Sequence, residues 1–218
     1  MSQPQLEKTE RTRLRRLYEK GSYERDTVNA ILDAMPMAHL GYLIDGKPSV
    51  LPTLQWREGD HVYWHGSSAS RALRAMKGAD VCLTVTILDG FVLARSAMHH
   101  SVNHRSVMLF GQAEQVTDPV EKALHLERMV ESLFPGRWPG LRPMTDQELK
   151  ATAVFRMPIS EGSAKTRSGQ PGDNEEDYAL PIWAGVLPVQ LALGEPVSDP
   201  ANLEGVAAPD HLSEVSIG

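Results

Sequence analysis

The chain has 218 residues, of which 41% are hydrophobic, so it is long enough to bury a sizeable core. Its net charge of −6 argues against a general nucleic-acid binder, because no basic excess is present to neutralise phosphates. The single cysteine, Cys82, excludes an internal disulfide framework and a cysteine-based zinc finger. No apolar run approaches the roughly 18 residues of a membrane span, and no signal peptide is recognisable, which predicts a soluble, cytoplasmic protein without a membrane partner.

Residues 1–22 form a charged arm with clustered arginines at Arg11, Arg13, Arg15 and Arg16. In an acidic chain this cluster favours a solvated arm over a nucleic-acid-binding patch. The next segment predicts a helix that Asp26 caps and Pro36 ends.

Strand patterns dominate the following part of the chain. Met37–Ile44 and Pro48–Trp56 flank Asp45-Gly46, the dipeptide most typical of a two-residue hairpin turn. A second turn, Glu58–Asp60, leads into a short strand over His61–His65.

The segment Val62–Arg71 then runs from an aromatic strand through a small polar turn into a helix. Backbone N–H groups at a helix start are unpaired, so such a corner suits an anion. Arg71 adds a planar cation that can hold a phosphate through two hydrogen bonds. Three hydroxyl groups can also donate, those of Ser67, Ser68 and Ser70. The corner therefore indicates a phosphate site; the alternative is that Ser67 or Ser68 only caps the helix and Arg71 is solvated.

After this helix, Val81–Leu88 and Phe91–Ala97 read as strands joined by an Asp89-Gly90 turn, and His104–Val116 reads as a further strand. Asp118, Pro119 and Glu121 are typical of a helix start. Apolar residues at helical spacing predict the buried face of that helix. They are Val120, Ala123, Leu124, Val130, Leu133 and Phe134.

The last strand of this series is expected over Ala151–Ile159. From Glu161 to Tyr178 the composition is that of a flexible linker, but the apolar stretch Leu180–Pro188 after it argues for packing. The tail from Gly194 onward is rich in proline and acidic residues and is expected to lie over the surface.

The pattern as a whole predicts about six strands joined mostly by tight turns, with three helices between them. Such a chain is mainly β, and a meander of this size closes most easily into an antiparallel barrel. We divide it into a charged arm (1–22), a barrel domain (23–160) and a C-terminal extension (161–218) that packs on the barrel or on a partner subunit.

The order of these elements resembles the split-barrel flavin-binding proteins related to pyridoxamine 5′-phosphate oxidase, in particular the branch with nitroimidazole-resistance proteins. The resemblance spans residues 12–188. The motifs that carry it are Leu51-Pro52-Thr53, Tyr63-Trp64-His65-Gly66 before the Ser/Arg corner, Asn103–Gly111, Lys165–Gly169 and Trp183-Ala184-Gly185.

This resemblance implies a homodimer of six-stranded split barrels with FMN in two grooves at the interface. Val50–Thr53 would run past the flavin ring, and Thr53 with backbone amides would donate to its pyrimidine edge. Ser70 and Arg71 would hold the phosphate, with Arg105 and Ser106 completing the cradle. The residues expected to bind the cofactor are Val50, Leu51, Pro52, Thr53, Trp64, His65, Gly66, Ser70, Arg71, Arg105, Ser106, Lys165 and Trp183, the last two from the other subunit.

The resemblance leaves the substrate open. Pro196–Gly218 contains no arginine or lysine, which argues against a phosphorylated pyridoxal-type substrate. We expect an FMN-dependent reductase of small electrophiles, such as nitroaromatic or quinone-like compounds, with a nicotinamide donor that docks transiently, because no Gly-x-Gly-x-x-Gly fingerprint is present. The alternatives are a flavin-binding redox sensor without turnover, or a split barrel that binds deazaflavin (F420) or heme.

Histidines supply the remaining candidates for chemistry. His65 is either the proton donor to substrate or a contact of the flavin ribityl chain. The group His99, His100 and His104 suggests a metal or heme site, but its spacing does not place three imidazoles on one strand face, so we expect no metal there.

Overall fold

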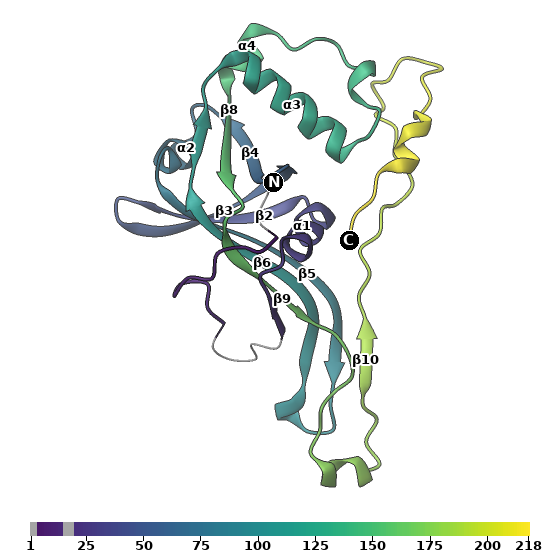
Figure 1. The fold of residues 1–218 in the computed structure, drawn as a ribbon. Coiled ribbons are helices and arrows are strands. Elements are labelled where there is room, and N and C mark those ends of the chain that lie inside the picture. Colours follow the sequence, from purple (N-terminus) through teal and green to yellow (C-terminus); the bar gives the residue numbers. More distant parts are fainter. Residues whose placement is uncertain (1–3, 15–19) are drawn as a thin grey trace.

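The computed structural model describes residues 4–14 and 20–218, which form one strongly curled antiparallel sheet with helices around it (Figure 1). Arg15 and Arg16 of the predicted arginine cluster lie outside these residues. The strand order is β1-β9-β6-β5-β2-β3-β4-β8-β7, and β10 pairs with β5. This architecture confirms the predicted mainly β split barrel, although ten strands are present in the described part instead of six.

The strands are β1 (Gly21–Ser22), β2 (Met37–Ile44), β3 (Lys47–Glu58), β4 (His61–Ser67), β5 (Asp80–Leu93), β6 (Ser101–Gln112), β7 (Glu114–Val116), β8 (Thr152–Pro158), β9 (Glu161–Arg167) and β10 (Gly185–Pro188). The helices are α1 (Arg25–Ala34), α2 (Arg71–Met76), α3 (Pro119–Leu133) and α4 (Asp146–Ala151), with single turns of 3₁₀ helix at η2 (Ala97–His99), η3 (Trp138–Gly140), η4 (Glu175–Ala179) and η5 (Asp210–Glu214). No described helix has the length and apolar character needed to cross a membrane.

The main core lies inside the curl of the sheet, where α1 closes it. Alternate residues of the strands point inward, and Val28, Ile31 and Leu32 of α1 pack on them. Trp64 and Phe155, from neighbouring strands, lie in this core with their rings stacked at 5.9 Å. The opposite side chains of β2, β3, β5 and β6 therefore face away from the core.

A second, smaller core lies under α3, on the other side of β3, β4 and β8. Leu126 of α3 packs there against Trp56 and Tyr63. The predicted buried face of α3 is wrong: Val120 is 77% exposed, and the buried residues are His125 and Leu126. His125 is buried because Glu58 accepts a hydrogen bond from its Nδ1 at 2.9 Å, so a polar residue occupies the side that faces the sheet.

Two of the predicted helix and strand boundaries are corrected. Asp26 is not the cap of α1; the cap position is Glu24, and the first helical N–H, that of Arg25, donates to the Pro4 carbonyl at 2.9 Å. Asp89-Gly90 is not a hairpin turn, because β5 continues through it to Leu93 with only a bulge. A Cβ on Gly90 would lie 3.0 Å from the carbonyl oxygen of Leu187, so this glycine permits the close approach of β10.

The N-terminal arm and the segment after residue 160 both join the fold. Leu6 is 4% exposed, and Glu7 forms a bridge to Glu161, so the described part of the arm is anchored on the sheet, while Arg11 and Arg13 are exposed. Glu161–Arg167, with the composition of a linker, is strand β9 and pairs with β6 along its length. Pairing satisfies the backbone of a polar segment as well as that of an apolar one.

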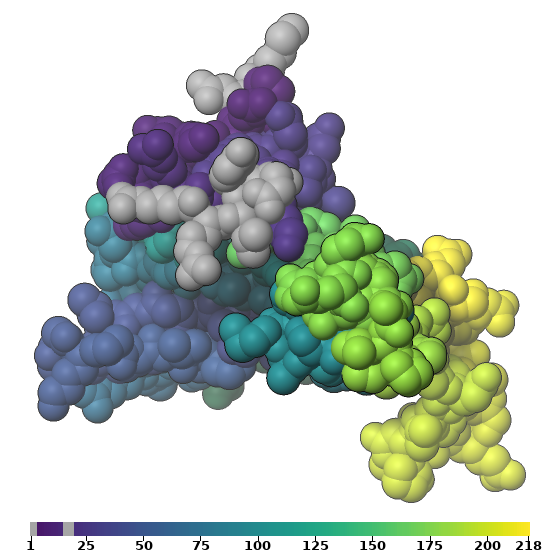
Figure 2. Space-filling view, turned by 90° about the horizontal axis from the view of Figure 1, so that it is seen from below, coloured from purple at the N-terminus to yellow at the C-terminus, as the bar shows by residue number. Residues whose placement is uncertain are grey.

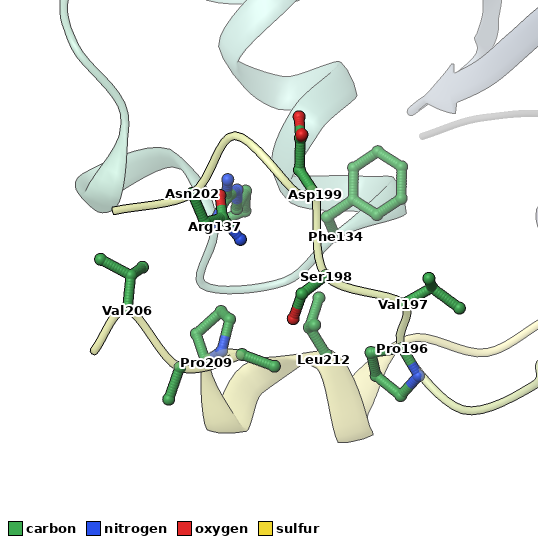
Figure 3. Close-up of a pocket in the computed structure, with 12 residues that line it drawn as sticks. Phe134, Arg137, Pro196, Val197, Ser198, Asp199, Asn202, Val206, Pro209 and Leu212 are labelled. Atoms are coloured by element: carbon green, nitrogen blue, oxygen red, sulfur yellow. The ribbon is translucent and has the colours of Figure 1, made fainter. Parts of the chain in front are cut away.

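The C-terminal tail lies along one side of the molecule and projects from it as an arm, drawn in yellow in Figure 2. Its contacts include the end of α3, where Phe134 and Arg137 line a cavity of about 400 Å³ with residues from Pro196 to Leu212 (Figure 3). An adjoining cavity of about 610 Å³ shares Phe134 and Leu212. Neither cavity is lined by a residue of the predicted cofactor site.

Candidate cofactor-binding site

The side of the sheet that points away from the main core presents exposed side chains on four adjacent strands, and we call it the outer face. Register pairs Val50 with Gly41, Pro52 with His39, and His39 with Thr84, so these positions share one side. Two of its large apolar side chains are more than half exposed, Val50 at 65% and Leu43 at 58%. The outer face comprises Met37, His39, Leu43, Val50, Pro52, Thr84, Thr86, Leu88, Ser106 and Met108.

The predicted run Val50–Thr53 alternates across the sheet, as a strand must. Val50 and Pro52 belong to the outer face. Leu51 packs against the core cluster, and Thr53 pairs with Ala38, which is fully buried. Thr53 therefore lies on the core side and does not direct its hydroxyl to the outer face.

The aromatic strand β4 divides in the same way. Trp64 is 0% exposed and belongs to the main core, whereas His65 lies on the opposite side, with its ring 6.0 Å from that of Trp56. Burial lowers the pKa of His65, so its imidazole is neutral at neutral pH, and its buried Nδ1 has no hydrogen-bond partner within the described residues. A Cβ on Gly66 would lie 2.9 Å from Leu73, which explains how α2 packs so closely after the strand.

The predicted phosphate corner is exposed at the start of α2. Ser70 caps the helix, accepting from the Leu73 N–H at 3.4 Å, so the cap is neither Ser67 nor Ser68. Arg71 is 75% exposed and pairs with Asp45 in the β2–β3 turn at 3.0 Å. An exposed pair of this kind contributes little stability, so an anionic ligand can displace the carboxylate.

The structure does not bring the other predicted phosphate ligands to this corner. Arg105 and Ser106 point to opposite sides of β6; Arg105 pairs with Asp89 at 2.8 Å, and Ser106 donates to the Lys165 carbonyl at 3.3 Å. Lys165 lies on β9, five strands along the sheet from β4, a path of about 24 Å at ordinary strand spacing. Trp183, 69% exposed, precedes β10 and packs on Gly185. One chain alone therefore does not assemble the predicted cradle.

The histidines His99, His100 and His104 have different surroundings. Nδ1 of His99 lies 3.6 Å from Asp173, which Arg95 already neutralises at 3.0 Å. Nδ1 of His100 lies 3.0 Å from the Ser96 carbonyl oxygen. His104 is in β6, and its pKa is lowered by burial and then by the nearby charge of Lys165. These contacts hold a loop in place and do not aim three imidazoles at one point.

Among the residues of the outer face that the sequence analysis did not select, His39 is the one with an imidazole side chain. It is exposed in β2, directly between Pro52 and Thr84. The signal was available: a two-residue turn at Asp45-Gly46 pairs Ile44 with Lys47, and counting back from that pair aligns His39 with Pro52.

The curled sheet and its exposed outer face define a split-barrel protein of the flavin-binding class. The chain belongs to the family described as pyridoxamine 5′-phosphate oxidase, whose model matches residues 24–166. A comparison with curated proteins gave no match.

Three solved structures describe the similarity. The flavocytochrome Anf3 from Azotobacter vinelandii is 48% identical with a TM-score of 0.93, covering 96% of this chain and 98% of that one. The FAD and heme binding protein from Mycobacterium smegmatis is 35% identical with a TM-score of 0.87, covering 90% and 97%. A 5-nitroimidazole antibiotic resistance protein from Bacteroides thetaiotaomicron, at 19% identity, TM-score 0.56 and coverage of 66% and 85%, is similar in fold.

Proposed function

We propose that this protein is an electron-transfer flavoprotein that binds FAD and heme on the outer face of its sheet. The observation that carries the proposal is the 48% identity over nearly the whole chain to a flavocytochrome, together with 35% identity to a protein named for FAD and heme. FAD replaces the FMN that the sequence analysis predicted, because FAD is the flavin that the second name gives.

The residues of the outer face fit a flavin. An isoalloxazine ring needs a flat apolar surface, and the exposed side chains of Val50 and Pro52 offer one. Arg71 can hold a phosphate once Asp45 is displaced. The bound flavin would supply the redox chemistry, and the chain would supply position and polarity around it.

The residues also fit a heme, through His65. A heme iron takes a neutral imidazole as its axial ligand. His65 is half-buried, its pKa is lowered by burial, and it lies beside the apolar Trp56 on the side that continues the outer face. Nδ1 of the loop residue His100 lies 3.0 Å from the Ser96 carbonyl oxygen, and Nδ1 of His99, which has no hydrogen-bond partner within the described residues, lies 3.6 Å from the Asp173 carboxylate. We therefore propose that His65 would bind the heme iron, in place of its predicted role in proton transfer.

A homodimer remains part of the proposal. The outer face exposes more apolar side chains than a solvated sheet ordinarily does, and an interface would cover them. A second copy would also supply the cations that one chain does not bring to the phosphate corner, Lys165 foremost, because β9 lies five strands along the sheet from β4. Each cofactor site would then be completed by both subunits.

An absorption spectrum of the purified protein, with extraction and identification of its chromophores, tests the proposal. FAD and heme together, in nearly equal amounts, are expected. A protein that contains neither and takes up neither when they are added contradicts the proposal.

His65→Ala is expected to lose at least about 90% of the heme while retaining FAD, because removing the axial ligand leaves only apolar contacts to hold the macrocycle. His100→Ala is the matched control, since His100 is exposed on a loop away from the outer face, and it should retain both cofactors. Full heme content in His65→Ala would remove this residue from the iron.

Reduction of nitroaromatic or quinone-like compounds with a nicotinamide donor is the narrower activity that we propose for the flavin. NADH or NADPH oxidation should then depend on added acceptor. If dithionite-reduced protein passes electrons to these acceptors at the rate of free FAD, the activity is not a property of the protein.

A further inference from the structure

His39 occupies the middle of the outer face, and no contact that we observe assigns it a structural role. It lies on β2, the strand between β3 and β5, with Pro52 on one side and Thr84 on the other. Its side chain is exposed, as are those of Met37 and Val50 on the same face. An exposed imidazole within an apolar surface is available to a ligand that covers that surface.

The neighbours of His39 on the two flanking strands carry no charge at neutral pH. On β3 they are Val50, Pro52 and Leu54, and on β5 Thr84 and Thr86. Cys82 on β5 faces the same side, and burial raises the pKa of its thiol. The charge of Arg11, which lies over the Phe110 ring, acts on Cys82 from this side.

The donor that the sequence analysis placed at the flavin ring is absent from this face. Thr53 points to the core side and its hydroxyl donates to the carbonyl of Leu54 at 3.4 Å. His39 aligns with Pro52, the next residue back along β3. The imidazole of His39 therefore lies beside the stretch of β3 from which the Thr53 hydroxyl was expected to donate to the flavin.

We propose that His39 donates a hydrogen bond to the ring of the bound flavin. This inference rests on the flavin-binding function proposed above. A flavin ring gains negative charge when it is reduced, and protein groups that donate to it favour the reduced form. The imidazole of His39 would therefore stabilise the reduced flavin more than the oxidised flavin.

The reduction potential of the bound FAD, measured by spectroelectrochemical titration, tests this role. In His39→Ala the reduced flavin should bind about tenfold less tightly relative to the oxidised flavin, equal to a potential about 30 mV more negative for a two-electron couple. His39→Gln retains a hydrogen-bond donor and should lie between the wild type and His39→Ala. His100→Ala is the control and should match the wild type.

The outcomes separate this inference from the proposed function. If the wild-type protein binds no flavin, the proposed function fails and this inference fails with it. If wild type and both His39 variants bind FAD with the same reduction potential, the inference alone is wrong. Loss of FAD from both variants, with an unchanged far-UV circular dichroism spectrum and FAD retained by His100→Ala, supports a direct contact of His39 with the flavin.

Discussion

Gly162 lies on β9 and pairs with Leu109 of the neighbouring strand β6. A Cβ at this position would be 2.6 Å from the Met108 carbonyl oxygen and 2.6 Å from Leu109 Cδ2. A Cβ on Gly111 of β6 would lie 2.7 Å from Met157 Cγ, but that atom belongs to a flexible side chain. Backbone cannot withdraw as a methionine side chain can, so the two glycines tolerate a methyl group differently.

Gly162→Ala is therefore expected to lower the free energy of unfolding by about 1–3 kcal/mol, the usual range for overpacking. Gly111→Ala should cost clearly less. Urea denaturation followed by circular dichroism compares the two variants with the wild type. Equal losses would mean that β6 and β9 move apart as easily as Met157 changes rotamer.

Arg71 is the residue of the predicted phosphate corner whose removal is least costly to the fold, because it is 75% exposed and its partner Asp45 is 81% exposed. Arg71→Ala should raise the dissociation constant for FAD at least about tenfold, the range expected for a charge-assisted hydrogen bond. Fluorescence titration of the apoprotein measures it. Arg142→Ala removes another exposed, ion-paired arginine, 69% exposed, and should leave flavin affinity unchanged. Unchanged affinity in Arg71→Ala would exclude this corner.

At the scale of elements, polar contacts decide how α3 and α4 are held on the sheet. Glu58 at the end of β3 accepts from Trp56 Nε1 at 2.8 Å and from Arg128 at 2.9 Å, in addition to His125. The start of α4 is a capping box in which Thr145 and Glu148 satisfy each other's backbone N–H groups. Hydrogen bonds to β3 therefore orient α3, and Lys122 of α3 links it to α4 by donating to the carbonyls of Leu149 and Thr152.

The pKa of Glu148 gives a test of the α4 start. The hydrogen bond from Arg142, followed by those from the backbone and hydroxyl of Thr145, lowers it to about 2. Since the folded-state pKa is depressed, this carboxylate stabilises α4 above its ordinary pKa of 4.5, and the contribution is lost as pH falls through about 2. Arg142→Gln should raise the pKa towards 4.5, measured by NMR titration of the carboxyl carbon. An unchanged midpoint would mean that Thr145 alone depresses it.

For the whole molecule, the outer face is the feature that most needs an explanation, because apolar residues from four strands are exposed together. If two copies meet on this surface, a charged side chain placed there loses its hydration in the dimer. The tail, which projects along one side, lies on a different part of the molecule and meets the end of α3.

Val50→Asp is expected to raise the dimer dissociation constant at least about 100-fold, since the two carboxylates would be buried unpaired or face each other. Val120→Asp provides the matched control, because Val120 is 77% exposed on α3, outside the outer face. Light scattering after size-exclusion chromatography measures both. If Val50→Asp remains a dimer that binds FAD, the copies meet elsewhere.

Local chemistry made much of the fold predictable from the sequence. Alternation of apolar residues located β2, β3, β4 and β8 to within two residues at their ends, and the Asp45-Gly46 turn, with φ of 52° and 72°, set the register of β2 on β3. Asp118 accepts from the Val120 and Glu121 N–H groups, as its position predicted. These features depend on residues close together in the chain, so the sequence contains all the information that decides them.

The tertiary structure alone decided the rest, because it depends on contacts between residues far apart in the chain. Pairing with β6 made a strand of the polar segment Glu161–Arg167, and the approach of β10 carried β5 through Asp89-Gly90. The outer face joins residues of four strands, and the curl of the sheet put Trp64 in the core and His65 outside it. The sequence by itself determined β2, β3, β4 and β8, the β2–β3 hairpin and the cap of α3; which side chains share a surface followed only from how the strands pack.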